Sequence, residues 1–210
     1  MPLSVIDVGA NYGNWSCKFL ELFPGKDVKI DAIEPIPHFF QSILRIDDER
    51  LSAHNIAIGK NGDSIRVARV GGGGTAFPEN SKLYPQRIKP PEWHELICES
   101  GDSFIKSNGL LPDLIKIDTD GLDFQILQTF GDTLIKTKPI IQFEFTFRFA
   151  RKANYSLLDI IEYLKKVNYK TYVITGDSKL KSVRYPRLEV LNHQTKNFIA
   201  LPSSKVLTIN

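Results

Sequence analysis

Acidic side chains follow several apolar runs of this sequence, at the points where each run ends. Residues Asp7 to Gly13 follow the first run, Glu34 ends the second, residues Asp118 to Asp123 follow a later run, and Glu144 lies in the next. The carboxyl ends of parallel strands meet at one edge of a sheet, so we expect these groups to lie together. Carboxylates at such an edge accept hydrogen bonds from sugar hydroxyls, take up a proton, or hold a divalent cation.

The first run, Leu3 to Val8, breaks into a loop that contains Gly9, Asn11 and Gly13. A strand, a glycine turn and a helix amino terminus form the usual nucleotide crevice of an open α/β sheet. Three residues separate the two glycines, so the G-x-G-x-x-G fingerprint of a pyrophosphate site is absent. Asn11 would crowd a diphosphate, whereas Glu34 suits a ribose because a carboxylate accepts hydrogen bonds from vicinal hydroxyls. The pattern therefore favours S-adenosylmethionine over NAD.

Strand patterns alternate with helical patterns along the chain, as in a doubly wound α/β fold. The expected strands are 3–8, 27–33, 53–58, 64–70, 95–98, 113–118, 139–147, 169–174 and 197–201. The expected helices are 15–23, 38–46, 101–107, 121–130 and 156–167, the last with Ser156 as its amino-terminal cap. We predict a Rossmann-like, mostly parallel sheet in which the last two strands form an antiparallel edge.

The segment between residues 58 and 93 has the weakest helix signals. Asn61 and Gly62 form a turn signal between Ile58 and the alternating run 64–70, which predicts a hairpin. Four consecutive glycines and several prolines follow. A structureless loop of about twenty residues is uncommon in a compact domain and is usually functional. We therefore predict a mobile lid or substrate loop at about 71–93, within a single domain that spans residues 1–210.

The composition limits the class of protein and its compartment. The 210 residues suit one large α/β domain, and 42% hydrophobic residues suffice for a core. A net charge of +3 does not indicate a dedicated nucleic-acid binder. Cys17 and Cys98 make neither a disulfide framework nor a four-ligand zinc set, which favours a reducing compartment. No apolar run reaches the ~20 residues of a membrane span and no signal peptide precedes the first strand, so we expect a soluble cytoplasmic protein.

Polar residues of two later strands are expected to share one face. Lys116 alternates with Asp118 on one strand, and Glu144 alternates with Gln142 and Thr146 on the next. A buried Lys116 needs a carboxylate partner, for which we predict Glu144. Asp118 is the candidate general base or, together with another acid, the candidate ligand of a divalent cation. Glu144 is expected to support Asp118 in either role.

Several motifs, taken in order, resemble those of a known family. They are VIDVGANYGNWS, the Glu34-Pro35 pair, AIGKNGDSIRV, GDSFI, LIKIDTDGLDFQIL and PIIQFEF. From about Val5 to Glu144, their order and spacing are similar to those of the FkbM-like S-adenosylmethionine-dependent methyltransferases. The resemblance implies the class I methyltransferase fold with a seven-stranded sheet. It also implies O-methylation of a hydroxyl on a saccharide or small metabolite.

The resemblance further implies which residues hold the cofactor. The methionine part would be lined by Asp7, Gly9, Asn11 and Gly13. Glu34 would hold the ribose, and Ala57 and Ile58 would lie near the adenine. The catalytic candidates, Lys116, Asp118 and Glu144, come from the strand pattern independently of the family.

Two features depart from the family pattern. Asp120 and Asp123 stand where the family usually has Glu, and we interpret Asp123 as an acid that stabilises the amino terminus of the next helix. The sequence begins on the first strand, without the preceding helices that often cover the site in the family. We therefore expect the glycine-rich loop, or a neighbouring subunit of a homo-oligomer, to close the site.

Other functions remain open from the sequence. NAD-dependent oxidoreductases and epimerases share the fold and the ribose acid, although the glycine spacing disfavours them. A nucleic-acid methyltransferase is disfavoured because residues 118–121, Asp-Thr-Asp-Gly, are not the proline-aromatic tetrad of amino-methylating enzymes. A non-catalytic cofactor-binding domain derived from such an enzyme is a further alternative. The sequence leaves open whether a divalent cation takes part.

Overall fold

The computed structural model describes residues 2–25, 27–70, 73–78, 93–176, 179–183 and 195–204. In chain order, the elements are β1 (Leu3–Val8), α1 (Asn14–Glu21), β2 (Val28–Ile33), α2 (Pro37–Ile43), β3 (Leu51–His54), β4 (Ala57–Ile58), β5 (Ser64–Val70), β6 (Gly73–Pro78), β7 (His94–Glu99), α3 (Gly101–Asn108), β8 (Leu114–Ile117), α4 (Asp123–Gln128), α5 (Gly131–Lys136), β9 (Ile140–Phe145), α6 (Phe147–Lys152), α7 (Leu157–Lys166), β10 (Tyr169–Ile174), β11 (Leu180–Ser182) and β12 (Lys196–Pro202).

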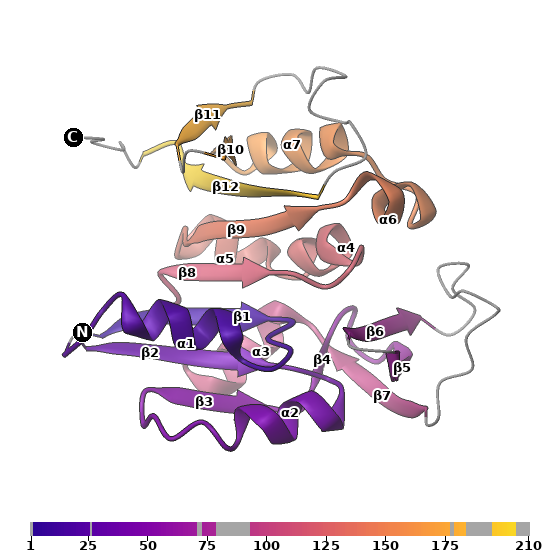
Figure 1. Cartoon of the computed structure of the whole chain (residues 1–210). Helices are drawn as coiled ribbons and strands as arrows, with labels where there is room; N and C mark the ends of the chain where they lie inside the picture. The colour runs from indigo at the N-terminus through magenta and orange to yellow at the C-terminus, as the bar shows by residue number, and fades with distance from the viewer. Residues whose placement is uncertain are drawn as a thin grey trace.

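The main sheet has the order β11-β10-β12-β9-β8-β1-β2-β3 (Figure 1). Five neighbouring strands, β3, β2, β1, β8 and β9, pair in parallel. The remaining strands, β12, β10 and β11, pair antiparallel with their neighbours. The predicted α/β fold with a mostly parallel sheet and an antiparallel edge is therefore confirmed. The sheet has eight strands instead of seven, because the three-residue β11 adds an outer edge to β10. A strand this short carries too little alternation to be recognised in a sequence.

A second sheet, in the order β4-β7-β5-β6, lies near the carboxyl ends of β1 and β2 (Figure 1). The predicted strand 53–58 divides between the sheets, since β3 ends at His54 and β4 begins at Ala57. The predicted hairpin between Ile58 and residues 64–70 is wrong, because β7 lies between β4 and β5. Asn61 binds the end of β7 instead: its side-chain oxygen accepts a hydrogen bond from the Ser100 N–H.

Part of the segment predicted as a loop is a strand. Residues Gly73–Pro78 form β6, which pairs antiparallel with β5 from Val70 opposite Gly73 to Ile65 opposite Pro78. Glycine has a low strand propensity, so the sequence pattern gives no signal for this pairing. Residues 71–72 and 79–92 lie outside the described residues. The lid or substrate loop therefore stays a prediction.

Helices cover both faces of the main sheet, as predicted for a doubly wound fold (Figure 1). Helices α3, α4, α5 and α7 share one apolar cluster with the sheet, whose buried members include Ile6, Ile117, Phe130, Phe143 and Leu164. Helices α1 and α2 pack on the opposite face in two smaller clusters, which include Leu20, Ile30 and Ile43. Successive side chains of a strand point to opposite faces. Because helices cover both faces, consecutive residues of the parallel strands are apolar.

The helix ends show where sequence signals were sufficient. Ser156 caps α7, as predicted: its hydroxyl accepts the Asp159 N–H while the Asp159 carboxylate accepts the Ser156 N–H. The sequence patterns do not predict α5 and α6, which have six residues each and present fewer than two helical turns. The predicted strand 139–147 ends at Phe145, because the chain turns into α6 after Thr146.

Within the described ranges, no helix is both long and apolar enough to cross a membrane.

Two glycines that begin helices test the packing of the core. A Cβ added at Gly101, the first residue of α3, would lie 2.3 Å from the Phe130 ring. At Gly131, the first residue of α5, the nearest atom would be the Tyr163 hydroxyl at 3.6 Å. We predict that Gly101→Ala lowers the free energy of unfolding by about 1–3 kcal/mol through overpacking. Gly131→Ala should leave it unchanged or raise it by up to about 1 kcal/mol. Urea unfolding measures both, and equal stability of the two variants would contradict the prediction.

Candidate functional site

The loop after β1 is held tightly between two neighbouring strand ends. The N–H groups of Gly9 and Ala10 both donate to the Ile33 carbonyl at the end of β2. Gly9 has a φ of +77°, and a Cβ there would lie 2.0 Å from the Asp118 carbonyl oxygen. No side chain fits at this position. Asn11 also has a positive φ, of 53°, which asparagine tolerates better than most residues.

Gly13 ends this loop as the amino-terminal cap of α1. Its φ is +80°, and a Cβ would lie 2.6 Å from a methyl carbon of Ile46. Glycine therefore occupies both positions of the loop, 9 and 13, at which a side chain would clash. Without side chains at these positions, a ligand can approach the loop backbone closely.

Glu34 fixes the first loop to the end of β2. Its two carboxylate oxygens accept hydrogen bonds from the Asn11 N–H and the Ile36 N–H, each at 2.8 Å. Only 4% of the residue is exposed. Burial raises the pKa of this carboxyl to about 7, although the two N–H donors act in the opposite direction. The Asn55 side chain, in turn, donates to the carbonyls of Glu34 and Pro35.

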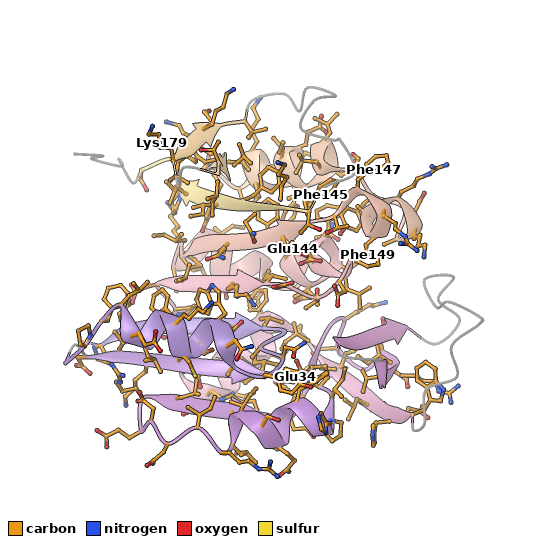
Figure 2. All side chains as sticks on the ribbon, viewed as in Figure 1. Glu34, Glu144, Phe145, Phe147, Phe149 and Lys179 are labelled. Atoms are coloured by element: carbon orange, nitrogen blue, oxygen red, sulfur yellow. The ribbon has the colours of Figure 1, made fainter. Side chains whose placement is uncertain are left out.

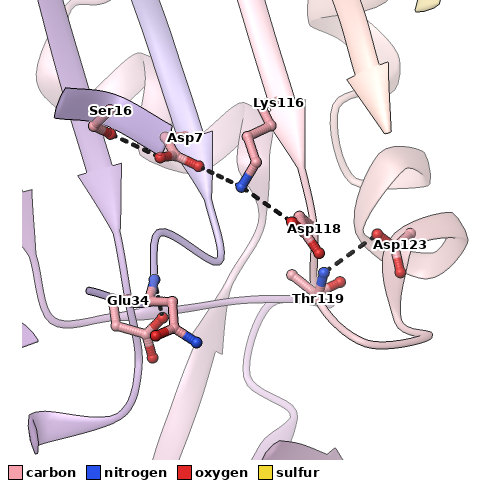
Figure 3. A network of polar contacts seen from close by, with 8 residues as sticks. Asp7, Ser16, Glu34, Lys116, Asp118, Thr119 and Asp123 are labelled. Atoms are coloured by element: carbon pink, nitrogen blue, oxygen red, sulfur yellow. Dashed lines mark hydrogen bonds and ion pairs between the residues drawn. The ribbon is translucent and has the colours of Figure 1, made fainter. Parts of the chain in front are cut away.

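A buried ion pair links the ends of β1 and β8 (Figure 3). One carboxylate oxygen of the fully buried Asp7 lies 2.9 Å from Nζ of Lys116, and the other accepts a 2.7 Å hydrogen bond from the Ser16 hydroxyl. The Lys116 ammonium also lies 3.5 Å from Asp118 and 5.6 Å from the centre of the Trp15 ring. Burial alone would lower the pKa of Lys116, but the two carboxylates outweigh it and raise the pKa.

Lys116 forms its ion pair with Asp7 and not with Glu144, so the predicted partner is wrong. Strand register explains the difference. Lys116 lies opposite Asp7 on one side and opposite Gln142 on the other. Glu144 stands two residues further along β9, beyond the pairing of Lys116. The expectation that the two strands are neighbours and that Lys116 has a carboxylate partner is confirmed.

The turn after β8 is held by a further buried acid, Asp123. The Asp123 carboxylate accepts the Thr119 N–H at 3.2 Å (Figure 3). It also accepts the Gly121 N–H at 3.0 Å. Burial raises the pKa of Asp123 to about 7. Asp123 lies in the first turn of α4, as the dipole interpretation expects, but its hydrogen bonds go to the preceding turn. Asp123 thereby holds the backbone of residues 118–121 in place.

Asp118 and Glu144 are more accessible than the buried acids Asp7, Glu34 and Asp123. The Asp118 side chain is 41% exposed, and Glu144 is half-buried on β9 (Figure 2). Burial, together with the charges of Asp118 and Asp120, raises the pKa of Glu144 to about 7. Burial and Asp118 also raise the pKa of Asp120. Clustered acids with raised pKa values are typical of functional sites.

The sequence alone leaves open whether the site binds a divalent cation. Across the described parts of the chain, no group of three or more His, Cys, Asp or Glu side chains is placed to hold a metal ion.

A cavity of about 970 Å³ opens between the second sheet and α4. Ile58 of β4 and Cys98 of β7 line one side, and Leu122 and Ile126 line the other. Polar groups of Ser64, Ser100, Gln125, Gln128 and Thr129 also border it. This volume is in the range of small-molecule sites. Ala57 and Ile58, which were predicted to lie near an adenine, are buried in β4, and Ile58 lines the cavity.

The structure brings most of the predicted residues into one region. Hydrogen bonds, ion pairs and close backbone contacts connect Asp7, Gly9, Asn11, Glu34, Lys116 and Asp118. Ala57 and Ile58 belong to the second sheet, and Glu144 borders the group from β9. Sequence reasoning missed the contacts of Ser16 and Trp15 with the buried ion pair. The only available signal was their place in the first turn of α1, directly after the glycine loop.

Comparisons with known proteins show the family and the fold of this chain. The sequence model of the family described as the methyltransferase FkbM domain matches residues 7–171. No protein of curated function matches the chain. A structure of the methyltransferase FkbM from Methylobacillus flagellatus KT is similar, with a TM-score of 0.60 and 17% identity. The match covers 95% of this chain but 43% of that one, so the present chain spans less than half of the length of that protein.

Two further solved structures share the fold. The precorrin-6y C5,15-methyltransferase from Geobacter metallireducens GS-15 has a TM-score of 0.50 and 13% identity, over 96% of this chain and 81% of that one. The plantazolicin methyltransferase BpumL, solved in complex with a pentazolic desmethylPZN analogue and SAH, has a TM-score of 0.51 and 9% identity, over 96% of this chain and 77% of that one. At these identities the likeness concerns the fold alone.

The buried ion pair yields a stability prediction. Lys116→Met leaves the buried Asp7 carboxylate without its cation, so it should lower the free energy of unfolding by about 3–5 kcal/mol. Asp7→Asn combined with Lys116→Met should recover a large part of this loss, because no unpaired buried charge remains. Lys136→Met is the matched control, since Lys136 forms an exposed ion pair with Asp132 and should change stability little. Urea unfolding of the variants tests this, and Lys116→Met as stable as Lys136→Met would contradict it.

Proposed function

Because this chain belongs to the FkbM methyltransferase domain family, we propose that it is an S-adenosylmethionine-dependent methyltransferase acting on a hydroxyl of a saccharide or small metabolite. One observation carries the proposal: a glycine loop, a buried Asp7–Lys116 pair and the accessible acids Asp118 and Glu144 adjoin at neighbouring strand ends. This edge is where open α/β sheets bind their ligands.

The site suits a cationic nucleotide-like molecule. S-adenosylmethionine, when bound, supplies a methyl carbon that its positively charged sulfonium activates. The acids around Lys116 favour such a positive charge. We propose that the backbone of residues 9–13 faces the methionine part, that Glu34 lies at the ribose, and that Ala57 and Ile58 lie near the adenine. The cavity lined by Ile58 and Leu122 supports the last assignment, because it has room for a ring system between two apolar sides.

The acceptor hydroxyl requires alignment and a proton acceptor. The sequence favours Asp118 as the general base, with Glu144 in support. We propose the reverse assignment, with Glu144 taking the hydroxyl proton, because a half-buried base with a pKa of about 7 is well matched to neutral pH. Asp118 is proposed to orient the hydroxyl, since its side chain is accessible and tied to Lys116. The buried Lys116 ammonium, 3.5 Å from the Asp118 carboxylate, is proposed to position Asp118. Alignment of the reacting groups is itself a large source of rate.

Two expectations from the sequence accompany this proposal. A reducing cytoplasmic compartment and closure of the site by the 71–93 segment, or by a neighbouring subunit, both stay predictions.

Cofactor binding provides the direct test. In calorimetric titrations we expect S-adenosylmethionine and its demethylated product to bind, and NAD not to bind. Gly9→Ala should weaken binding of S-adenosylmethionine by about tenfold or more, because its Cβ displaces the loop from Asp118. Gly25→Ala is the control, since Gly25 also has a positive φ but has open space around it. Binding of NAD alone would refute the proposal and favour the oxidoreductase alternative.

The pH dependence tests the role of Glu144. Glu144 accepts a proton only when ionised, so kcat/KM should rise about tenfold per pH unit below pH 7 and level off above it. Glu144→Gln should remove this rise and reduce kcat by about a hundredfold or more. Glu162→Gln, which changes an exposed acid of α7, should leave the profile unaltered. Assays with and without a metal chelator show whether a divalent cation takes part. Retention of the full kcat by Glu144→Gln would exclude Glu144 as the base.

A further inference from the structure

Helix α6 carries an unbalanced group of cations. Arg148, Arg151 and Lys152 are all exposed, and residues 145–158 contain no Asp or Glu. Positions three and four apart lie on the same side of a helix, so the three cations share one face. In the part of the chain that the structure describes, none of them forms an ion pair.

Helix α6 borders the proposed methyl-transfer site. It follows β9 directly, and Glu144 lies three residues before its first residue (Figure 2). A Cβ at Gly121 would lie 2.6 Å from Cβ of Phe149, so the helix packs against the turn that Asp118 begins. Gly121 also has a φ of +108°, which further favours glycine there. The helix that carries the three cations is therefore held beside the turn that Asp118 begins.

Helix stability does not account for this arrangement. Arg151 and Lys152 lie in the last turn of α6, where cations are favoured by the helix dipole. Arg148 lies in the first turn, where a cation is disfavoured and where α6 has no acid to offset it. Among the described residues, Arg148 therefore has no acidic partner, although it is exposed beside the candidate site at a position that the helix dipole disfavours.

The charge of the whole chain is divided in the same way. Residues 147–210 contain twelve Lys and Arg against four Asp and Glu, whereas residues 1–146 contain fifteen against twenty. The boundary falls where β9 passes into α6. The modest net charge of +3 thus hides an acidic amino-terminal part of the sequence and a basic carboxyl-terminal part that begins at α6.

We propose that the acceptor carries a negatively charged group, a phosphate or a carboxylate, which binds the α6 face formed by Arg148, Arg151 and Lys152. The inference rests on the proposed function and names its substrate class. Arginine binds both groups through paired charge-assisted hydrogen bonds. The acids at one end and the cations at the other orient the acceptor, so that its hydroxyl meets Glu144. A nucleic-acid strand suits the surface less well, because Asp118, Asp120 and Glu144 would repel its continuous phosphates.

The test uses the full chain, methyl-labelled S-adenosylmethionine and a protein-free extract of small metabolites and oligosaccharides. We expect the labelled product to be retained by an anion-exchange resin at neutral pH. Release by phosphatase identifies a phosphate, and retention after phosphatase identifies a carboxylate. Label in the unretained fraction, or label lost on nuclease treatment, overturns the inference while the proposed methyl transfer stands. No label in any fraction overturns the proposed function, and the inference with it.

Variants then assign the anionic group to α6. With the retained acceptor, Arg148→Gln and Arg151→Gln should each raise KM by about tenfold with little change in kcat, because they remove a charge-assisted contact away from the reacting atoms. Arg148→Lys, which keeps the charge, should lose less. Lys166→Gln, at an exposed cation of α7, is the matched control. Affinity for S-adenosylmethionine, measured by calorimetry, should be the same in all variants. A KM for Arg148→Gln equal to that of Lys166→Gln would overturn the inference.

Discussion

The buried ion pair between Asp7 and Lys116 is the constraint on which the rest of the site depends. Two charges removed from water are costly, and the cost is met only when each charge has close partners. Lys116 has Asp7 and Asp118, and Asp7 has Lys116 and the Ser16 hydroxyl. The pair and its hydrogen bond to Ser16 therefore connect β1, β8 and α1. The glycine loop and the Asp118 turn are built on this connection.

The acids of the site fall into two groups that differ in burial and in role. Asp7, Glu34 and Asp123 are buried, and their oxygens accept hydrogen bonds from groups of the protein itself. They hold loops in shape. Asp118 and Glu144 are more accessible and border the cationic helix α6. A rigid inner shell that supports a few accessible groups is the arrangement that precise positioning of a reacting hydroxyl requires.

Much of the fold followed from local patterns. The apolar runs, the helix capped by Ser156 and the acids at strand ends were all recognisable, because each signal lies within about ten residues of sequence. The errors share a cause. β11, β6 and the short helices α5 and α6 carry weak local patterns, and the hairpin expected at Asn61 fails because β7, more than thirty residues later, separates the two strands.

The sequence by itself determined which residues reach the carboxyl edge of the sheet, since strand period and glycine spacing are local properties. Only the tertiary structure decided how those residues pair. Lys116 required a carboxylate on sequence grounds alone, yet its partner Asp7 is 109 positions away and was selected by the register of β1 on β8. The placement of α6 beside the Asp118 turn was decided in the same way, by packing of Phe149 on Gly121. Register and packing join distant segments, and no local pattern encodes them.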